Sequence, residues 1–302
     1  MNLIRVTHEL NESISVSWHL PGLPWHTPFV PVLTYGYTAG LRPYLHPLFA
    51  PVGGPCLTQD RPTDHPWQHG IFVGLHGVNG LDFWVEHRAK PELRGDVRCV
   101  GIRDLRADDW TASWTALNEW RGPDGDLILE EGHTVCVRRP ETSECYEVDF
   151  TWALTGAVPV SMVRDSYGGL SVRLVEHPLH THVNANRQTG EACAEQRAAW
   201  CDVSAPFDGS LEWTAEDLLA GAWNGLAVLD HPSNATFPTP WRVDAQGLIN
   251  PSPSLLGDWH LEPGEDQVFR YRLVVHRGPG EFELLQSRWE QFASAQDLSR
   301  VG

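Results

Sequence analysis

We predict an all-β protein, a large antiparallel β-sandwich with one short helix at its C-terminus, and two observations support this fold class. The 302 residues include 27 Gly and 23 Pro, and such frequent turn formers suit many short strands better than long helices. Stretches in which apolar and polar residues alternate recur along the chain, which is typical of half-buried strands. A chain of this length can bury one large core, so we expect a single domain over residues 1–302.

The predicted strands occur in six places, at 13–18, 134–139, 147–154, 170–177, 225–231 and 268–276. Each stretch is bounded by Gly, Pro, Asn or Asp, as strands of an antiparallel sheet should be. The last is the most regular: Phe269, Tyr271 and Leu273 alternate with Arg270, Arg272 and Val274. This alternation predicts one face in the core and one face in water.

The C-terminal segment from Gly280 to Gln296 is the one that we expect to be helical. Apolar residues recur there at helical spacing, namely Phe282, Leu285, Trp289 and Phe292. Such a stripe predicts an amphipathic helix that packs on a sheet.

Composition and charge exclude several classes of partner. The formal net charge is −17, and both nucleic acid and anionic membrane need basic patches on the protein.

The longest apolar stretch, 218–229, is broken by Asn224 and falls short of the ~18 residues that span a bilayer. The first residues turn polar too early for a signal peptide. We therefore expect a cytoplasmic protein; the sequence sets no oligomeric state.

The densest polar cluster lies between residues 42 and 84, where histidines and aspartates alternate with Pro and Gly. Its members are Arg42, His46, Asp60, Asp64, His65, His69 and His76. One interpretation is a site in which imidazoles and carboxylates transfer protons or bind a ligand. The alternative is a loop that is held together by hydrogen bonds from these side chains to the backbone.

A second polar group contains His177, His180 and His182. On a strand, His180 and His182 would share one face, which makes them candidate metal ligands; the alternative is an exposed loop. No cofactor is required by the sequence. If the protein holds a metal, we expect an exchangeable divalent cation, because no thiolate cluster is present to select copper or iron–sulfur chemistry.

The third polar group follows a buried stretch that ends at Asp230. His231 and Asn234 stand there between prolines, and such side chains at a strand end can hydrogen-bond sugar hydroxyls. Trp241 follows, and an indole face can stack on a pyranose ring. The alternative is a tight turn next to a core tryptophan.

Known catalytic motifs are absent. The sequence contains no GxSxG, Walker loop, HExxH or GxGxxG that opens a helix, so nucleotide-dependent and α/β-hydrolase chemistry lose their usual support. Four glutamates could contribute to a carboxylate pair for glycoside hydrolysis: Glu86, Glu130, Glu131 and Glu176.

Several segments together resemble the bacterial PmoA-like family, which often carries the label "methane oxygenase PmoA". They are RPYLHPLFAP (42–51), TQDRPTDHPWQHGIFVGLHGVNGLDFW (58–84), YGGLSVR (167–173), AAWCDVSAPFDG (198–209), GLAVLDHPSNATFPTPW (225–241) and YRLVVHRG (271–278). Trp67 and Gln68 depart from the family's more His- and Arg-rich version of this motif. The resemblance implies a galactose-mutarotase-like supersandwich whose concave face binds sugars, and not a membrane-embedded oxygenase subunit.

We therefore expect a carbohydrate-active enzyme, a lyase, epimerase or hydrolase, that acts on a saccharide or an oxidised (keto) sugar by His/carboxylate acid–base catalysis. His65 and His69 are the acid–base candidates and Asp64 the orienting group. The expected pocket residues are Arg42, which could also stabilise an enolate, His46, His231, Asn234 and Trp241. The alternatives are a non-catalytic sugar-binding or sensor protein and a metal-dependent β-sandwich oxygenase with two histidines and a carboxylate. We expect the RPYLHP, DHPWQHG and DHPSN segments to meet at one end of a concave sheet face.

Overall fold

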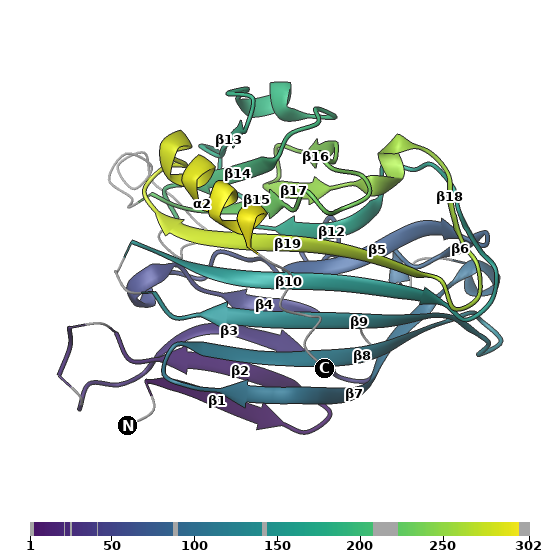
Figure 1. Cartoon of the computed structure of the whole chain (residues 1–302), viewed down its shortest axis with the longest axis horizontal. Helices are drawn as coiled ribbons and strands as arrows, with labels where there is room; N and C mark the ends of the chain where they lie inside the picture. Colours follow the sequence, from purple (N-terminus) through teal and green to yellow (C-terminus); the bar gives the residue numbers. More distant parts are fainter. Residues whose placement is uncertain are drawn as a thin grey trace.

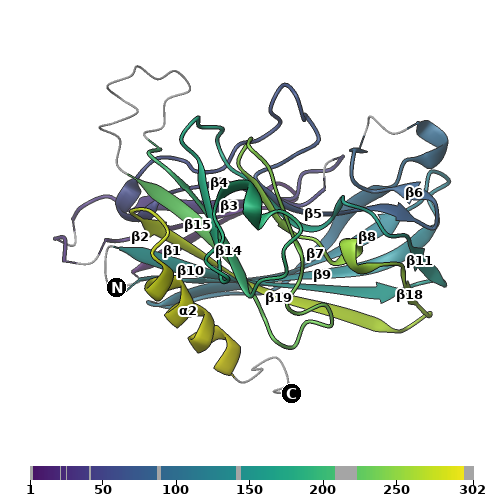
Figure 2. The ribbon, with the colours of Figure 1, turned by 90° about the horizontal axis from the view of Figure 1, so that it is seen from above.

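Two large antiparallel sheets are stacked face to face in this computed structural model, which describes residues 3–20, 22–24, 26–40, 42–86, 90–140, 144–207 and 223–295 (Figures 1 and 2). One sheet has 11 strands and the other has eight, and a helix near the C-terminus packs beside them. The predicted fold class is confirmed.

The 11-stranded sheet has a main path of eight strands and three short side strands. In spatial order the path is β1 (Ile4–Glu9), β2 (Ser13–Trp18), β3 (Val30–Gly36), β4 (Tyr44–Leu48), β5 (Ile71–Val78), β12 (Gly168–Arg173), β17 (Leu248–Pro251) and β16 (Trp241–Val243). Strands β6 (Leu81–Asp82) and β11 (Val160–Met162) pair with β5, and β18 (Trp259–Leu261) pairs with β11.

The eight-stranded sheet contains the longest strands of the molecule. Its order is β13 (Thr181–Asn184), β14 (Trp200–Ala205), β15 (Asn224–Asp230), β19 (Asp266–Arg277), β10 (Cys145–Gly156), β9 (Leu127–Arg138), β8 (Thr111–Arg121) and β7 (Asp96–Ala107). Short 3-10 turns occur at η1 (Pro51–Gly53), η3 (Pro91–Leu93), η4 (Gly190–Cys193) and η5 (Pro253–Leu256).

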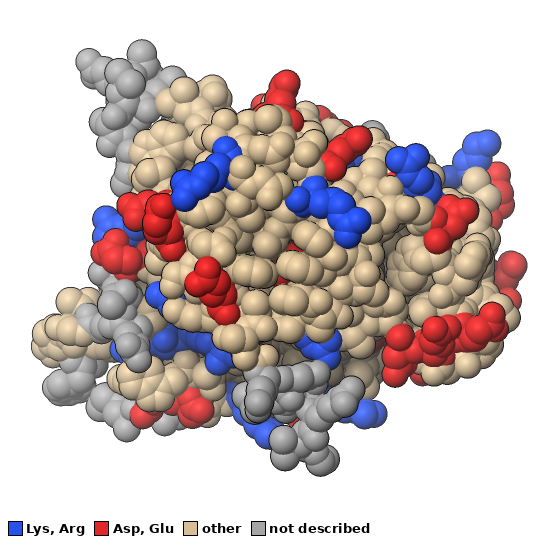
Figure 3. Space-filling model, turned by 45° about the horizontal axis from the view of Figure 1, so that its top comes forward, with Lys and Arg blue, Asp and Glu red and all other residues tan. Residues whose placement is uncertain are grey.

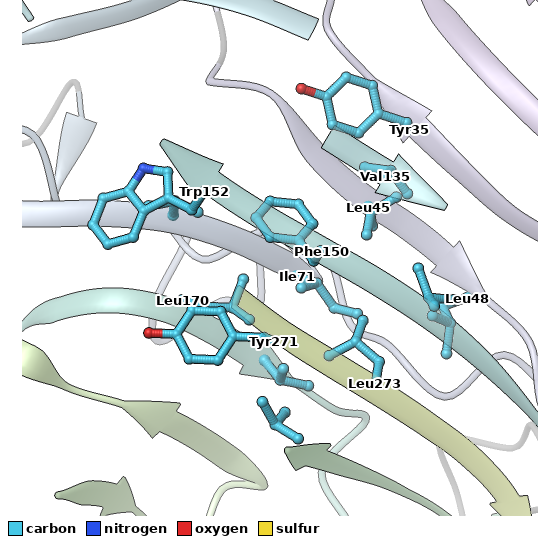
Figure 4. Packing of buried hydrophobic residues seen from close by; sticks show 14 of the residues in the cluster. Tyr35, Leu45, Leu48, Ile71, Val135, Phe150, Trp152, Leu170, Tyr271 and Leu273 are labelled. Atoms are coloured by element: carbon cyan, nitrogen blue, oxygen red, sulfur yellow. The ribbon is translucent and has the colours of Figure 1, made fainter. Parts of the chain in front are cut away.

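The core lies between the two sheets. Figure 4 shows side chains of both sheets in this layer, among them Tyr35, Leu45 and Ile71 from the larger sheet and Phe150 and Trp152 from the smaller one. These side chains belong to one buried hydrophobic cluster that both sheets share. Burial of this much apolar surface is the main stabilising contribution to such a fold.

Helix α2 (Phe282–Ser294) covers part of the outer face of the eight-stranded sheet (Figure 2). Its predicted apolar stripe is confirmed, since Leu285 and Phe292 are buried against that sheet. Gln296, the predicted end, lies outside the described residues. The helix also corrects the prediction for β19: Val274 lies under α2 and is 0% exposed, so the second face of this strand is not simply in water.

Strand limits differ from the prediction in two places that matter for the site. Strand β12 ends at Arg173, Leu174 forms one isolated bridge with Thr58, and residues 175–177 are not in a strand. Strand β13 begins at Thr181, which leaves His180 in the preceding turn and not on a strand face with His182. Within the described residues, no helix has the length and apolar character needed to cross a membrane.

Candidate functional site

A row of side chains crosses the outer face of the larger sheet, the face that points away from the smaller sheet. Tyr44 on β4 pairs with Phe72 on β5, which pairs in turn with Ser171 on β12. The β12–β17 register continues the row to Asn250, which pairs with Arg242 on β16. Because neighbours in each strand point into the core, the alternation of strand residues places these five on the opposite face.

The loop that carries the DHPWQHG motif stands at the β4 and β5 side of this row. Residues 60 and 69 face each other as an isolated antiparallel bridge, and the backbone N–H of Arg61 donates to Gln68 O at 2.8 Å. Gly70 N donates to Gln59 O at 2.8 Å. The chain therefore makes a hairpin-like loop that brings Asp60 next to His69.

Gly70 lets this loop approach strand β4 closely. Its φ is +44°, a region that L side chains rarely adopt. A Cβ at this position would stand 2.3 Å from the carbonyl oxygen of Leu45 and 2.9 Å from the Cβ of His46. The glycine after His69 therefore allows the contact between the two predicted polar segments.

Arg42, Glu86, His69 and Asp60 form one continuous charged network. Arg42 Nε donates to Glu86 Oε1 at 2.7 Å, and Glu86 Oε2 accepts from His69 Nε2 at 3.1 Å. The other ring nitrogen, His69 Nδ1, donates to Asp60 Oδ1 at 2.7 Å. The side chains of Arg42 and His69 are 3% and 0% exposed. The structure thus brings Arg42 and His69 together, as the sequence predicted.

Arg42 uses most of its hydrogen-bond donors inside the protein. Besides Glu86, its guanidinium donates to three backbone carbonyl groups, those of Val73, Phe83 and Trp84. A guanidinium has five N–H donors, so four of them are occupied. Arg42 therefore fixes Glu86 and the strand ends around it, and it is poorly placed to stabilise an enolate directly.

The charges of this network shift the pKa values of its members. Burial alone would raise the pKa of Glu86, but the charge of Arg42 and the hydrogen bond from His69 outweigh it and lower the pKa from 4.5 to about 2. Burial would lower the pKa of His69, yet its bonds to Asp60 and Glu86 raise it overall. Carboxylates only accept hydrogen bonds, so both ring nitrogens carry protons. His69 is an imidazolium in this arrangement and has no free lone pair.

His65 and Asp64, at the tip of the same loop, have a different geometry. His65 Nδ1 donates to Asp64 Oδ2 at 2.7 Å, and the histidine side chain is 29% exposed. Asp64 Oδ2 also accepts from Gln246 Nε2 at 2.8 Å. Arg173 Nη2 lies 3.7 Å from the same carboxylate, and that arginine is fully buried at the end of β12. Asp64 is thus fixed by the sheet beneath it.

The second ring nitrogen of His65 is available for chemistry. Nε2 makes no hydrogen bond with the part of the chain that the structure describes. Burial would raise the pKa of Asp64, but the hydrogen bond from His65 and the charge of Arg173 lower it overall. An ionised Asp64 holds the proton of the imidazole on Nδ1, which leaves a lone pair on Nε2.

Two further residues adjoin the charged network. His46 Nδ1 and Thr58 Oγ1 are 2.9 Å apart, and burial lowers the pKa of this histidine, so it stays neutral. The ring of Tyr44 lies over that of His69, with centroids 4.8 Å apart. His46, predicted as a pocket residue, therefore lies near the network.

Three aromatic rings, those of Phe72, Trp84 and Tyr167, lie next to one another at this row. The ring of Trp84 lies 5.4 Å from Phe72 and 5.6 Å from Tyr167, and the Arg242 guanidinium lies 4.2 Å above the Tyr167 ring. Tyr167 is 41% exposed. A hollow of about 210 Å³ opens beside Tyr167 and Arg242.

The DHPSN segment makes its contacts elsewhere. His231 lies against Phe292 of helix α2, with ring centroids 4.8 Å apart. Asn234 is buried and bonds Asp230 and the backbone of Arg270 on β19. No contact among the described residues links these two to Arg42 or His69. This turn belongs to the side of the smaller sheet that α2 covers.

Trp241 is a core residue. It is 0% exposed, and its indole N–H donates to the carbonyl oxygen of Ala198 at 2.8 Å. Its ring packs in the cluster between the sheets, so no indole face is available to a sugar. Trp241 is therefore a core tryptophan next to a tight turn, which was the alternative to a sugar-stacking role.

The candidate metal ligands His180 and His182 both line a hollow of about 760 Å³, but within the described residues they are not part of a ligand cluster. His180 Nε2 bonds Val175 O at 3.0 Å, and its Nδ1 accepts from the backbone N–H of His177 at 3.3 Å. Burial lowers the pKa of His180 to about 4. Among the described residues, no group of three or more His, Cys, Asp or Glu side chains is arranged to hold a metal ion.

Two other polar residues that the sequence offered as candidates, Glu131 and His76, form hydrogen bonds within the protein. Glu131 is buried in the core, where it accepts from Trp152 Nε1 and Asn118 Nδ2. His76 is on the surface and bonds Asp165 at 2.8 Å. Sequence reasoning missed Arg173 and Gln246, because their contacts with Asp64 depend on which distant segments meet in the fold.

The comparisons with known proteins give a family and a set of distant structures. Residues 30–290 match the family DUF6807, described as a family of unknown function, and not the PmoA-like family that the motifs resemble. No curated protein matches the chain.

Three solved structures illustrate the similarity. Galactose 1-epimerase from Lactobacillus acidophilus NCFM is 9% identical, with 92% of this chain and 99% of that chain covered and a TM-score of 0.41. An alpha-galactosidase from Geobacillus stearothermophilus is 11% identical, with 91% and 40% covered and a TM-score of 0.36. The alpha-galactosidase from Lactobacillus brevis is 10% identical, with 96% and 41% covered and a TM-score of 0.31. The chain thus spans about two fifths of either galactosidase. At these TM-scores the likeness carries no argument about function.

Proposed function

We propose that this protein, which belongs to the DUF6807 family, is an enzyme that binds a saccharide or an oxidised sugar on the outer face of its larger sheet and acts on it by acid–base catalysis. The observation that carries the proposal is the His65–Asp64 pair, with a carboxylate on one ring nitrogen and an open lone pair on the other. A lyase or an epimerase fits this pair best, because both reactions begin with removal of a carbon-bound proton.

His65 has the geometry of a general base. Asp64 accepts the Nδ1 proton and is itself fixed by Gln246 and Arg173, so the ring has one orientation and one tautomer. Nε2 takes a proton from a sugar carbon next to a carbonyl group, and the electron pair moves to the carbonyl oxygen as an enolate. In a lyase the enolate then expels the oxygen substituent on the adjacent carbon, and the protonated ring gives its proton to that oxygen. In an epimerase the enolate turns in the site and takes the proton on its opposite face.

His69 has a positioning role in this proposal. Both of its nitrogens are bonded to carboxylates and its side chain is 0% exposed, so it neither accepts a proton nor touches a substrate in this geometry. It holds Asp60 and Glu86 together and thereby fixes the base of the loop that carries His65. Its replacement should affect stability and loop position first.

The row contains three polar atoms without a partner among the described residues, but Ser171 and Asn250 are 0% exposed, so the exposed Tyr167 beside the row is the surface open to a sugar. Ser171 Oγ, Asn250 Oδ1 and Arg242 Nη1 have no hydrogen-bond partner among the described residues. Buried polar atoms are normally paired with protein, water or ligand. The exposed ring of Tyr167 gives the row an apolar surface on which a sugar ring can stack.

The experiment is a substrate screen with three histidine variants. Neutral glycosides, uronides and 3-keto-glycosides are incubated in D₂O, and mass spectrometry follows both product formation and deuterium incorporation at carbon. We expect His65→Gln to lower the rate by about 10²–10⁴-fold while sugar affinity stays nearly unchanged. His76→Gln is the matched control, because His76 is also bonded to an aspartate but none of its described contacts involves the His65 loop.

Two outcomes contradict the proposal. If His65→Gln and His76→Gln retain the same rate, His65 is not the base. If sugars bind to the wild-type protein without any product or deuterium exchange, the protein is a binding or sensor protein and not an enzyme. His69→Gln serves as a further comparison, since a positioning residue should lower the unfolding midpoint together with the rate.

A further inference from the structure

A second hollow, of about 320 Å³, is lined in part by Arg42 and Glu86 of the charged network. Four arginines contribute to its wall: Arg42, Arg94, Arg98 and Arg121. This is a strong concentration of positive charge, because the whole chain has 22 Lys and Arg against 39 Asp and Glu. The face shown in Figure 3 is mostly uncharged, and acidic side chains gather in a row at its lower right.

The arginines of this hollow differ in how far their charge is already neutralised. Arg42 is paired with Glu86. Arg98 and Arg121 share the single carboxylate of Glu119, at 3.7 and 2.8 Å. Arg94 makes no hydrogen bond or ion pair with any described residue. Arg98 and Arg121 thus share one carboxylate, and Arg94 lines the same wall. Guanidinium N–H donors therefore remain for a further anion.

The wall has space because small residues line it. Gly40, Gly95, Gly122 and Gly125 stand between the charged side chains. Gly95 is required where it stands, because a Cβ there would lie 2.3 Å from the ring of Phe83, which forms part of the same wall. A volume of 320 Å³ is at the lower end of the range for small-molecule sites, about 300–1,000 Å³, so it suits a single small unit.

We infer that this arginine pocket, defined by Arg94, Arg98 and Arg121, binds the carboxylate of an acidic saccharide such as a uronate. The inference rests on the proposed function and names its substrate class. Arginine is the residue that pairs with carboxylates in two-pronged geometry. Glu86 lines this pocket and also accepts a hydrogen bond from His69, so the pocket and the charged network share this carboxylate.

The experiment compares charged and neutral sugars by isothermal titration calorimetry. The probes are galacturonate and a di-galacturonide, with galactose as the neutral counterpart and galactose 6-phosphate as the phosphate counterpart. We expect the wild-type protein to bind the uronides more tightly than galactose, with an affinity that falls as salt rises. Arg94→Gln and Arg98→Gln should each weaken uronide binding by about 10- to 100-fold, the usual effect of one charged hydrogen bond.

Two matched variants test the electrostatic cause. Arg106→Gln removes an arginine from the same strand as Arg98, but one that lies outside the pocket and is 78% exposed, so uronide affinity should not change. Asp96→Asn removes a negative charge from the pocket wall, so uronide affinity should rise. None of these surface changes should lower the unfolding midpoint.

The outcomes separate this inference from the proposed function. If uronides and galactose bind equally, or if the pocket variants behave like Arg106→Gln, the arginine pocket is not the carboxylate site, although the proposed function can stand. Tighter binding of galactose 6-phosphate than of uronides would overturn the carboxylate in favour of phosphate. If uronides bind in an arginine-dependent manner without turnover, this inference holds and the catalytic proposal fails.

Discussion

Replacement of Glu86 by Gln gives the sharpest test of the charged network. The carboxylate accepts from Arg42 Nε at 2.7 Å and from His69 Nε2 at 3.1 Å, and its side chain is only 13% exposed. These partners lower its pKa from 4.5 to about 2 in spite of burial, which acts in the opposite direction. Glutamine keeps the shape but removes the charge that both cations face.

The expected change in the free energy of unfolding follows from the difference between the folded-state and unfolded-state pKa of Glu86. A pKa lowered from 4.5 to about 2 corresponds to about 3 kcal/mol of stability at pH 7. Because the folded-state pKa is the lower one, this stability is present above pH 4.5 and is lost as the pH falls through 2. At pH 3 about 1.5 kcal/mol remains. An independent expectation agrees: removal of one partner from a buried ion pair costs about 3–5 kcal/mol.

Urea unfolding of wild type and Glu86→Gln at pH 7, 5, 4 and 3 measures this effect. We expect the variant to be less stable by about 3 kcal/mol at pH 7 and pH 5, and the difference to shrink by about 2 kcal/mol between pH 5 and pH 3. Glu283→Gln is the control, since Glu283 is 82% exposed and has one ion pair, with Arg187; no comparable change should occur. A difference that is absent at pH 7, or that stays constant down to pH 3, would refute the reasoning.

Two further predictions use the same unfolding assay. Burial, with the charge of His182, lowers the pKa of His180 from 6.5 to about 4, so wild type should lose about 3 kcal/mol as the pH falls from 6.5 towards 4. His180→Gln should remove this loss, and an unchanged pH profile between 7 and 4.5 would contradict the assignment. Gly70→Ala should cost about 2 kcal/mol or more and lower activity, since strain at positive φ of about 1–2 kcal/mol is joined by the clash with Leu45 O. Gly40→Ala, with φ +88° and nothing within 4 Å of the added Cβ, isolates the strain; equal unfolding midpoints for the two variants would show that the clash is absent.

Alternation along the chain predicted part of the fold, and the exceptions have physical reasons. Strand β2 is found at 13–18, as predicted. Strand β8 was missed although its burial alternates along its whole length, because three of its buried positions are Ala112, Ala116 and Asn118, which carry little hydrophobic signal. Strand β7 was missed because most of it is exposed and its register shifts twice. The covered face of β19 needed knowledge of α2, which only tertiary structure supplies.

The site was predicted as a stretch of sequence and not as a set of contacts. The polar density of residues 42–84 identified Arg42 and His69, and the structure joins them through Glu86. The contacts that fix Asp64 come from far along the chain: Gln246 lies 182 positions away. Such partners are invisible to local patterns, because they depend on which strands become neighbours. The same limit explains His231, whose turn resembles the DHPWQHG loop in composition but packs against α2.

Burial separates two histidines that the sequence could not distinguish. His65 and His69 stand four residues apart in one motif and both meet an aspartate at 2.7 Å. His69 meets a second carboxylate on its other nitrogen and is 0% exposed, so ion pairing keeps it protonated and removes it from proton transfer. His65 meets only one carboxylate and is partly exposed, so its second ring nitrogen keeps a lone pair for a proton. The number of carboxylates on each ring, more than the presence of the ring itself, therefore decides which histidine can act as a base.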